Sequence, residues 1–287
     1  MKNIFLFLVS IIVLSSCEKT VNNVEIPQVD PQLVVQSFLT EHQDSVKVYV
    51  SWSAPIYSSF EYNYEDVKDA DVYITNNGNK IKLDFKAVND PYGYRNSSYY
   101  IAPATGLVLK AGEKVELDIT EPKGNHVTSE TIIPVKPIYS ISLTSVDSTK
   151  EEWSEYGYTY KYNFKLTGNN LENINYYTTV VMGYYTSPYS GIDSVLLQDY
   201  SGGTGYYKIA KGDDVFISYP SYNPLDSIKA TVYLTDEAYY RYHNSVALFD
   251  GGDNPFSEPV IIYSNIENGL GVFCSYNSDF KIFKIKN

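Results

Sequence analysis

Residues 46–52 read Val-Lys-Val-Tyr-Val-Ser-Trp, and this stretch decides the class of fold. Apolar side chains take every second position, whereas Lys47, Tyr49 and Ser51 take the positions between them. Successive side chains of a strand point to opposite faces of a sheet. The alternation therefore predicts a strand with one face in a core and the other face in water.

The sequence around this stretch continues in the same manner. Asn76-Asn77-Gly78-Asn79 separates two β-rich runs and supplies the positive-φ residues that a tight hairpin demands. The block ends at Ile133-Pro134-Val135-Lys136-Pro137, because these prolines cannot continue a central strand. Short runs at this spacing predict an immunoglobulin-like β-sandwich over residues 31–135. The expected strands are 33–39, 46–52, 70–75, 81–88, 99–102, 115–119 and 127–133.

Residues 138–287 predict a second domain, an antiparallel β domain rich in Tyr. One short helix is expected near residues 236–248, where Thr235 can cap the start and Asp236 and Glu237 complement the positive end of the helix dipole. The fold class is thus all-β with one helix. The expected strands are 138–146, 158–167, 175–185, 194–198, 206–210, 215–219, 228–234, 260–263, 270–276 and 280–285.

The N-terminus carries the pattern of an export signal. A positive charge at Lys2 precedes an apolar run over residues 4–14, which is shorter than the roughly 20 residues of a membrane-spanning helix. Leu14-Ser15-Ser16-Cys17 resembles the lipobox of bacterial lipoproteins, in which the Cys thiol accepts a diacylglycerol. We therefore expect residues 1–16 to be a cleaved lipoprotein signal peptide, Cys17 to carry a covalent lipid, and residues 17–30 to be a tether.

Composition excludes several classes of function. The formal charge is −12, and the basic residues form no cluster beyond Lys281, Lys284 and Lys286, so we expect no nucleic-acid partner. Cys17 and Cys274 are the only cysteines, so lipidation of the first leaves no intramolecular disulfide. Cys274 lies in a strand-like run, where a buried thiol is expected.

Tyrosine is the most distinctive component of the sequence, with 30 residues of 287. If the alternation of the strand expected at 158–167 extends back to Tyr156, four of these rings share one face, and two more follow in a later strand. Such a face either stacks on sugar rings or packs on a partner protein, or it is an ordinary strand surface covered by neighbouring rings. The candidate ligand or partner surface comprises Tyr156, Tyr158, Tyr160, Tyr162, Tyr184 and Tyr185.

No catalytic constellation is found in the sequence. The three His residues are far apart, and neither a G-x-S-x-G elbow nor a glycine-rich phosphate loop occurs. We therefore expect no enzyme and no cofactor other than the lipid. Asp250, Asp253 and Glu258 form a weak calcium candidate, but their spacing differs from an EF-hand loop, and a helix stop followed by turn residues is the favoured interpretation.

Two C-terminal segments, residues 254–259 (Asn-Pro-Phe-Ser-Glu-Pro) and 264–273 (Ser-Asn-Ile-Glu-Asn-Gly-Leu-Gly-Val-Phe), carry a resemblance to a known family. Together with residues 33–40 and 67–72, they resemble a Bacteroidota lipoprotein family that contains domain of unknown function 4249. The resemblance covers nearly the whole chain after Cys17 and brings no enzymatic residues. It implies an outer-membrane lipoprotein, typically encoded beside a TonB-dependent receptor.

The functional expectation combines the lipobox with this resemblance. We expect an outer-membrane, surface-exposed lipoprotein that is a non-enzymatic accessory or ligand-capturing subunit of a TonB-dependent transporter in nutrient uptake. Attachment at the periplasmic face stays open, because only Glu18 supplies an acidic charge before Lys19. The alternatives are a structural or assembly factor of an outer-membrane protein complex and, with less support, a surface glycan-active enzyme.

Overall fold

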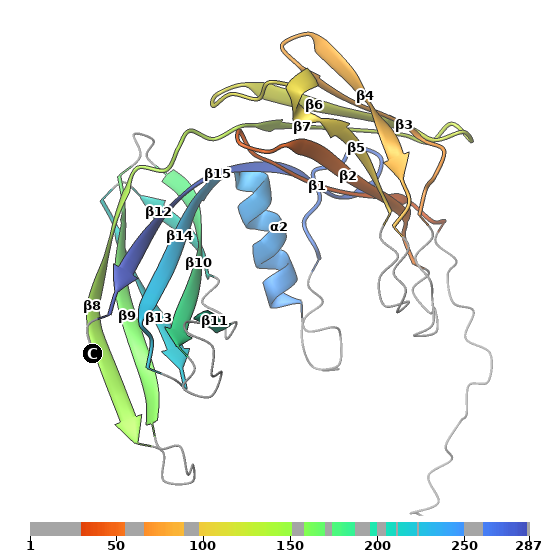
Figure 1. The fold of residues 1–287 in the computed structure, drawn as a ribbon. Helices are drawn as coiled ribbons and strands as arrows, with labels where there is room; N and C mark the ends of the chain where they lie inside the picture. Colours follow the sequence, from red (N-terminus) through yellow and green to blue (C-terminus); the bar gives the residue numbers. More distant parts are fainter. Residues whose placement is uncertain are drawn as a thin grey trace, which may run out of the picture.

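The computed structural model describes residues 30–54, 66–88, 98–150, 158–169, 174–186, 196–199, 205–210, 212–222, 224–249 and 261–285. Its strands form one mixed sheet of 12 strands and a second sheet of 3 strands, accompanied by one α-helix (Figure 1). The prediction of a mostly β fold with one helix is therefore confirmed. Outside the described residues lie Cys17, Tyr156, Asp250, Asp253 and Glu258.

The N-terminal strands form one continuous path. Their order in the sheet is β1-β2-β5-β4-β3-β6-β7, and each neighbouring pair is antiparallel. A short 3-10 helix, η1 (Ala104–Gly106), follows β5. The bounds are β1 (Leu33–Leu39), β2 (Ser45–Trp52), β3 (Asp71–Asn76), β4 (Asn79–Lys86), β5 (Tyr99–Pro103), β6 (Lys114–Thr120) and β7 (His126–Ile132).

An immunoglobulin-like sandwich is not confirmed, because such a fold divides its strands between two sheets. The N-terminal part of the sheet instead curls around its own core, in which Val48, Ile74 and Leu117 from separate strands are each at most 1% exposed. The alternation in β2 is confirmed, since Val46 and Val50 are also buried. Side chains of one face of a curled sheet converge, so a single sheet can enclose a core.

The hairpin between β3 and β4 forms as the sequence predicts. Asn76 pairs with Asn79, and the two residues between them have positive φ, 48° at Asn77 and 78° at Gly78. These angles define the primed turn whose twist matches that of the flanking strands.

Strand β15 (Leu270–Lys284) joins the two halves of the molecule (Figure 1). Its first residues pair in parallel with β1, from Val34↔Leu270 to Leu39↔Ser275. Its remaining residues pair antiparallel with β14 (Ser227–Thr235). The prediction of two separate strands over 270–276 and 280–285 is therefore wrong, because the polar residues between them continue the strand. The prediction of a strand over 260–263 is also wrong for residues 261–263, which have no regular structure.

The C-terminal half contains the second sheet and a second core. β9 lies between β8 and β13 in the small sheet, whose inner face packs on β10 and β14 of the large sheet. Phe164 and Phe283 bridge the two layers, with ring centroids 5.3 Å apart. The remaining bounds are β8 (Tyr139–Lys150), β9 (Tyr158–Gly168), β10 (Ile174–Thr186), β11 (Leu196–Asp199), β12 (Gly205–Ala210) and β13 (Asp214–Ser221).

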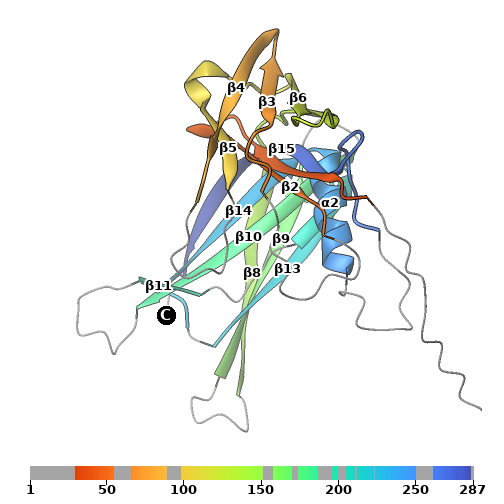
Figure 2. The same ribbon diagram turned by 90° about the vertical axis from the view of Figure 1, so that its right-hand side faces the viewer.

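The helix α2 (Glu237–Leu248) lies where it was expected and packs mainly against β15 (Figures 1 and 2). Its cap is Asp236 rather than Thr235, because the Asp236 side chain accepts a hydrogen bond from Tyr239 N at 2.7 Å. The Thr235 hydroxyl instead donates to Tyr176 O at 3.3 Å. Among the described residues, no helix combines the length and the apolar content required to cross a membrane.

Candidate functional site

A cavity of about 730 Å³ lies where the two halves meet. Pockets for small ligands typically enclose about 300–1,000 Å³. Its walls come from the end of β7, the linker to β8, the facing ends of β10 and β14, and the start of α2. The lining residues are Gly112, Ile132, Ile133, Pro134, Val135, Lys136, Ile138, Asn175, Tyr176, Leu234, Thr235, Asp236 and Glu237.

The linker supplies an apolar wall that is partly open to solvent. Ile132, Val135 and Ile138 are 56%, 49% and 52% exposed, although each is a large aliphatic residue. Prolines on either side of Val135 keep the segment extended and out of a ladder. A ligand that covers aliphatic side chains gathered at a cavity removes apolar surface from water, which favours binding.

A half-buried carboxylate, that of Asp236, lines the cavity just before the start of α2. Its Oδ2 accepts hydrogen bonds from Ser275 N at 3.1 Å and from the Thr131 hydroxyl, while its Oδ1 caps α2. Burial raises the pKa of the Asp236 carboxyl to about 6, although the hydrogen bonds from Thr131, Tyr239 and Ser275 oppose that rise. One side chain therefore holds β7, β15 and α2 together.

The next residue, Glu237, adds a second carboxylate at the rim. It forms a long ion pair of 4.0 Å with Arg241 and lies near the hydroxyl of Tyr176. Burial, followed by the charge of Glu237, raises the pKa of Tyr176. The only lysine of the described lining, Lys136, is engaged with Asp279 at 3.4 Å. The site thus combines apolar walls with excess negative charge.

An aromatic cluster that the sequence did not reveal fixes α2 on the sheet. The rings of Tyr239 and His243 stack at 4.2 Å, and Phe38 of β1 lies 5.7 Å from Tyr239 and 5.3 Å from His243. Tyr276 of β15 packs edge-on against Tyr239 at 6.0 Å and against Tyr233 of β14 at 5.4 Å. Burial lowers the pKa of His243. Phe38 and Tyr276 come from strands that are distant from α2 in sequence, so periodicity within α2 could not identify the cluster.

The described members of the predicted tyrosine surface do not form one exposed surface. Tyr158, Tyr160 and Tyr162 do share one face of β9, but this face looks inward: Tyr162 is 1% exposed and its hydroxyl accepts a hydrogen bond from Leu225 N at 2.8 Å. Tyr160 and Tyr185 pack against the same core. Tyr158 is 46% exposed, and Tyr184 is half-buried.

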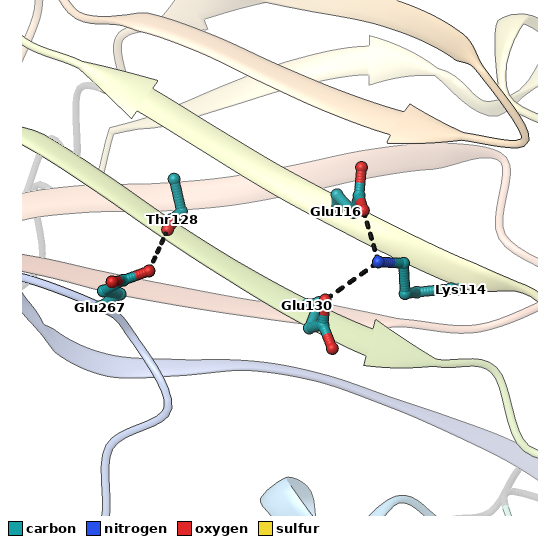
Figure 3. A network of polar contacts seen from close by, with 5 residues as sticks. All are labelled: Lys114, Glu116, Thr128, Glu130 and Glu267. Carbon is teal, nitrogen blue, oxygen red and sulfur yellow. Dashed lines mark hydrogen bonds and ion pairs between the residues drawn. The ribbon is translucent and has the colours of Figure 1, made fainter.

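A polar groove on the N-terminal sheet is a weaker candidate. Figure 3 shows the polar contacts of four of its lining residues, Glu116, Thr128, Glu130 and Glu267, together with Lys114. Lys114 Nζ lies 2.6 Å from Glu116 and 3.1 Å from Glu130, while Thr128 donates to Glu267 at 3.0 Å. The side chains of this lysine and its two partners are at least 50% exposed, so water and salt screen their attraction. The hydrogen bond from Thr128 attaches Glu267 to β7, so we interpret these contacts as structural.

The segment 264–273 has a structural explanation. Asn265 acts as a clamp, because Nδ2 donates to Phe273 O at 2.8 Å and Oδ1 accepts from Phe273 N at 3.0 Å. Gly271 has a φ of 106°, and a Cβ there would collide with the Val35 carbonyl. These residues permit the close parallel pairing of β15 with β1.

Comparison with known families gives a match over most of the chain. The family model described as "Domain of unknown function (DUF4249)" matches residues 19–282. The chain belongs to the DUF4249 family. The clamp at Asn265 and the close approach at Gly271 thus lie inside the DUF4249 match, as do the cavity and α2. No curated protein matches the chain.

The described part of this DUF4249 chain holds no group of three or more His, Cys, Asp and Glu side chains that could bind a metal ion. Cys274 is buried as expected, with its thiol 3.8 Å from Ser37 O, and burial raises its pKa. A thiol in this environment packs as a small apolar group.

Proposed function

We propose that this protein is a lipid-anchored, non-enzymatic binding subunit of the outer membrane, which captures a ligand for a TonB-dependent transporter in nutrient uptake. The observation that carries the ligand-binding part is the cavity between the two halves, with its exposed aliphatic wall and its two carboxylates. The lipobox at residues 14–17 supports the anchor. The resemblance to Bacteroidota lipoproteins supports the transporter partner.

The lining indicates the chemistry of the captured ligand. An apolar body would cover Ile132, Val135 and Ile138, which removes aliphatic surface from water. A protonated amine or a hydrogen-bond donor would face Glu237 and Asp236, whose charge the formal net charge of −12 reinforces. An amphipathic ligand with a cationic end is the best match.

A pull-down from the native host in mild detergent tests the transporter partner. Tagged parent protein is expected to recover an outer-membrane receptor, as identified by mass spectrometry, whereas the Cys17→Ala variant stays soluble and recovers none. Recovery of no outer-membrane protein by the parent would count against this function. Protease shaving of whole cells separates outer-surface display, where the protein is digested, from attachment at the periplasmic face, where it is protected.

Native mass spectrometry of the purified full chain tests the cavity. Val135→Trp places a large ring on an exposed wall position, so the fold tolerates it while the cavity loses volume. We expect small molecules that co-purify with the parent to be absent from this variant. Val108→Trp is the matched control, because Val108 is 65% exposed and does not line the cavity. Equal ligand content in all three proteins would exclude the cavity as the capture site.

A second candidate function, a structural or assembly factor of an outer-membrane complex, is favoured by another observation. Phe280 and Ile282 of β15 are 53% and 57% exposed on the outer face of the large sheet. Lys229 lies 4.5 Å above the Phe280 ring and leaves the rest of it open. A receptor that co-purifies without any ligand, and is lost with Phe280→Ser, would favour this permanent interface.

A further inference from the structure

The outer face of the small sheet carries a preorganised polar ladder. Asn163 of β9 stands at its centre: Nδ2 donates to Ser145 Oγ at 3.0 Å and to Asp147 Oδ2 at 2.7 Å. From the other side, the Ser218 hydroxyl of β13 donates to Asn163 Oδ1 at 2.5 Å. The ladder therefore crosses all three strands and holds its four side chains in one arrangement.

A β-bulge brings two of these side chains to this face. The pairing register of β8 with β9 shifts between Leu143↔Phe164 and Ser145↔Asn163, and the Thr144 hydroxyl donates to Asn163 O at 2.9 Å. The extra residue reverses the alternation, so that odd-numbered residues point inward before the bulge and outward after it. Bulges commonly re-aim side chains at functional sites.

Two exposed aromatic rings bracket the ladder along β13. Phe216 is 75% exposed and Tyr222, just beyond the end of the strand, is 74% exposed. Ser218 lies between them in sequence, and Phe216 is the cross-strand partner of Lys165. A ligand that covers the Phe216 ring would remove apolar surface from water, which is favourable.

The ladder retains hydrogen-bonding capacity for a ligand. Among the described residues, Asp147 Oδ1 receives no hydrogen bond, and Lys161, which pairs with Asp147 across the strands, forms no ion pair. An acceptor and a donor thus stand side by side. The two lysines of this face, Lys161 and Lys165, balance Asp147 and Asp214, so the surface as a whole carries no excess charge.

These features fit a saccharide better than a protein partner. A sugar ring offers an apolar face of C–H groups for stacking and hydroxyl groups that both donate and accept hydrogen bonds. The core of a protein interface is a larger, contiguous apolar patch. Here polar side chains separate the two rings. Because the positive and negative charges of this surface balance, an uncharged saccharide is favoured over a charged one.

We propose that the outer face of β8, β9 and β13 binds an uncharged polysaccharide, which stacks on Phe216 and Tyr222 and bonds to Asp147 and Lys161. The hairpin of β8 and β9 extends beyond β13 (Figure 2), and the ladder lies where all three strands still pair. The site is separate from the cavity and does not depend on its ligand.

Affinity electrophoresis of the full chain in mild detergent tests the proposal. The gels contain starch glucan, mixed-linkage β-glucan, galactomannan or xylan, with dextran sulfate as a charged comparison. We expect at least one neutral polysaccharide to retard the parent protein. Phe216→Ala should weaken that binding about tenfold, because it removes one stacking contact. Tyr222→Ala and Asp147→Asn should each weaken it several-fold.

Phe280→Ala is the matched control, since it removes an exposed ring from the outer face of the other sheet and should bind like the parent. An unchanged thermal midpoint in Phe216→Ala confirms that the loss is not one of folding. The proposal is overturned if no neutral polysaccharide retards the parent, if only dextran sulfate does, or if Phe216→Ala binds as the parent does. Val135→Trp should leave saccharide binding unchanged, which separates this site from the cavity.

Discussion

The two halves of the molecule build their cores from different side chains. The first core is largely aliphatic, and Tyr100 is its only fully buried tyrosine among the described residues. The second core contains Tyr162, Tyr177 and Tyr219, each at most 1% exposed. This difference shows that a high tyrosine content can result from the way a core is built. The ring fills volume in the core, and its hydroxyl forms a hydrogen bond with a buried backbone group.

The hydroxyls in the second core bond to backbone groups outside their own strand pairs. Tyr162 accepts from Leu225 N at 2.8 Å and Tyr219 accepts from Gly183 N at 3.2 Å. Tyr177 donates to Ile138 O at 3.3 Å, in the linker between the halves. In the described part of the first half, Tyr100 acts in the same way: its hydroxyl accepts from Ala70 N and donates to Val67 O, each at 2.9 Å.

The largest effect is expected from a substitution in β15, the strand that the two halves share. Gly271→Ala places a Cβ against the Val35 carbonyl at a positive φ, and should cost more than about 4 kcal/mol of unfolding free energy. Urea unfolding measures it, and hydrogen exchange should show the β1–β15 pairing opening first. Gly112→Ala is the control, because Gly112 has a φ of 83° with nothing within 4 Å. Equal losses in both variants would contradict this role of Gly271.

The pH dependence of stability tests Asp236, whose side chain connects β7, β15 and α2. Burial raises the pKa of Asp236 from its ordinary value of 3.8 to about 6 in the folded protein, so the folded state binds the proton more tightly. Protonation of Asp236 therefore contributes up to about 3 kcal/mol to the free energy of unfolding. This contribution is complete below the pKa that Asp236 has in the unfolded chain, and it is lost as the pH rises through 6. Urea midpoints should therefore rise from pH 7 to pH 5 relative to Asp236→Asn. Parallel profiles in the two proteins would rule out Asp236 as the cause.

A hydroxyl deletion sharpens the contrast between the cores. Tyr162→Phe keeps the ring but leaves Leu225 N–H unsatisfied, which should cost about 1–3 kcal/mol. Tyr160→Phe is the comparison within the same strand, because Tyr160 is only partly buried and should change stability little. Urea unfolding distinguishes the two variants, and equal stability would mean that the Tyr162 hydroxyl contributes no net free energy.

The smallest effect is expected on the outer surface of the first half. Lys114→Met removes the ammonium between Glu116 and Glu130, whose side chains are 50% and 67% exposed. Exposed ion pairs contribute about 0–1 kcal/mol, so the urea midpoint should move little, and less still in high salt. A loss comparable to that of Tyr162→Phe would show that this surface network supports the curled sheet.

Local patterns predicted the strands well, for identifiable reasons. Alternation located β2 and its buried valines, the Asn77-Gly78 pair located the β3–β4 turn, and acidic residues located the start of α2 within one residue of its cap. Each of these signals depends on residues that are neighbours in sequence. The cavity and the aromatic cluster around Tyr239 could not be found in this way, because their walls come from distant segments.

The tyrosines of β9 mark the boundary between the two kinds of information. The sequence by itself determined that Tyr158, Tyr160 and Tyr162 share a face, because strand geometry fixes the alternation. Only the tertiary structure decided that this face is the inner one. A tyrosine ring suits both a core and a solvent-exposed surface, and the packing of the large sheet on this face is what buries it. The parallel pairing of Val35 with Gly271 was likewise decided in three dimensions, since contacts between distant segments leave no local period in the sequence.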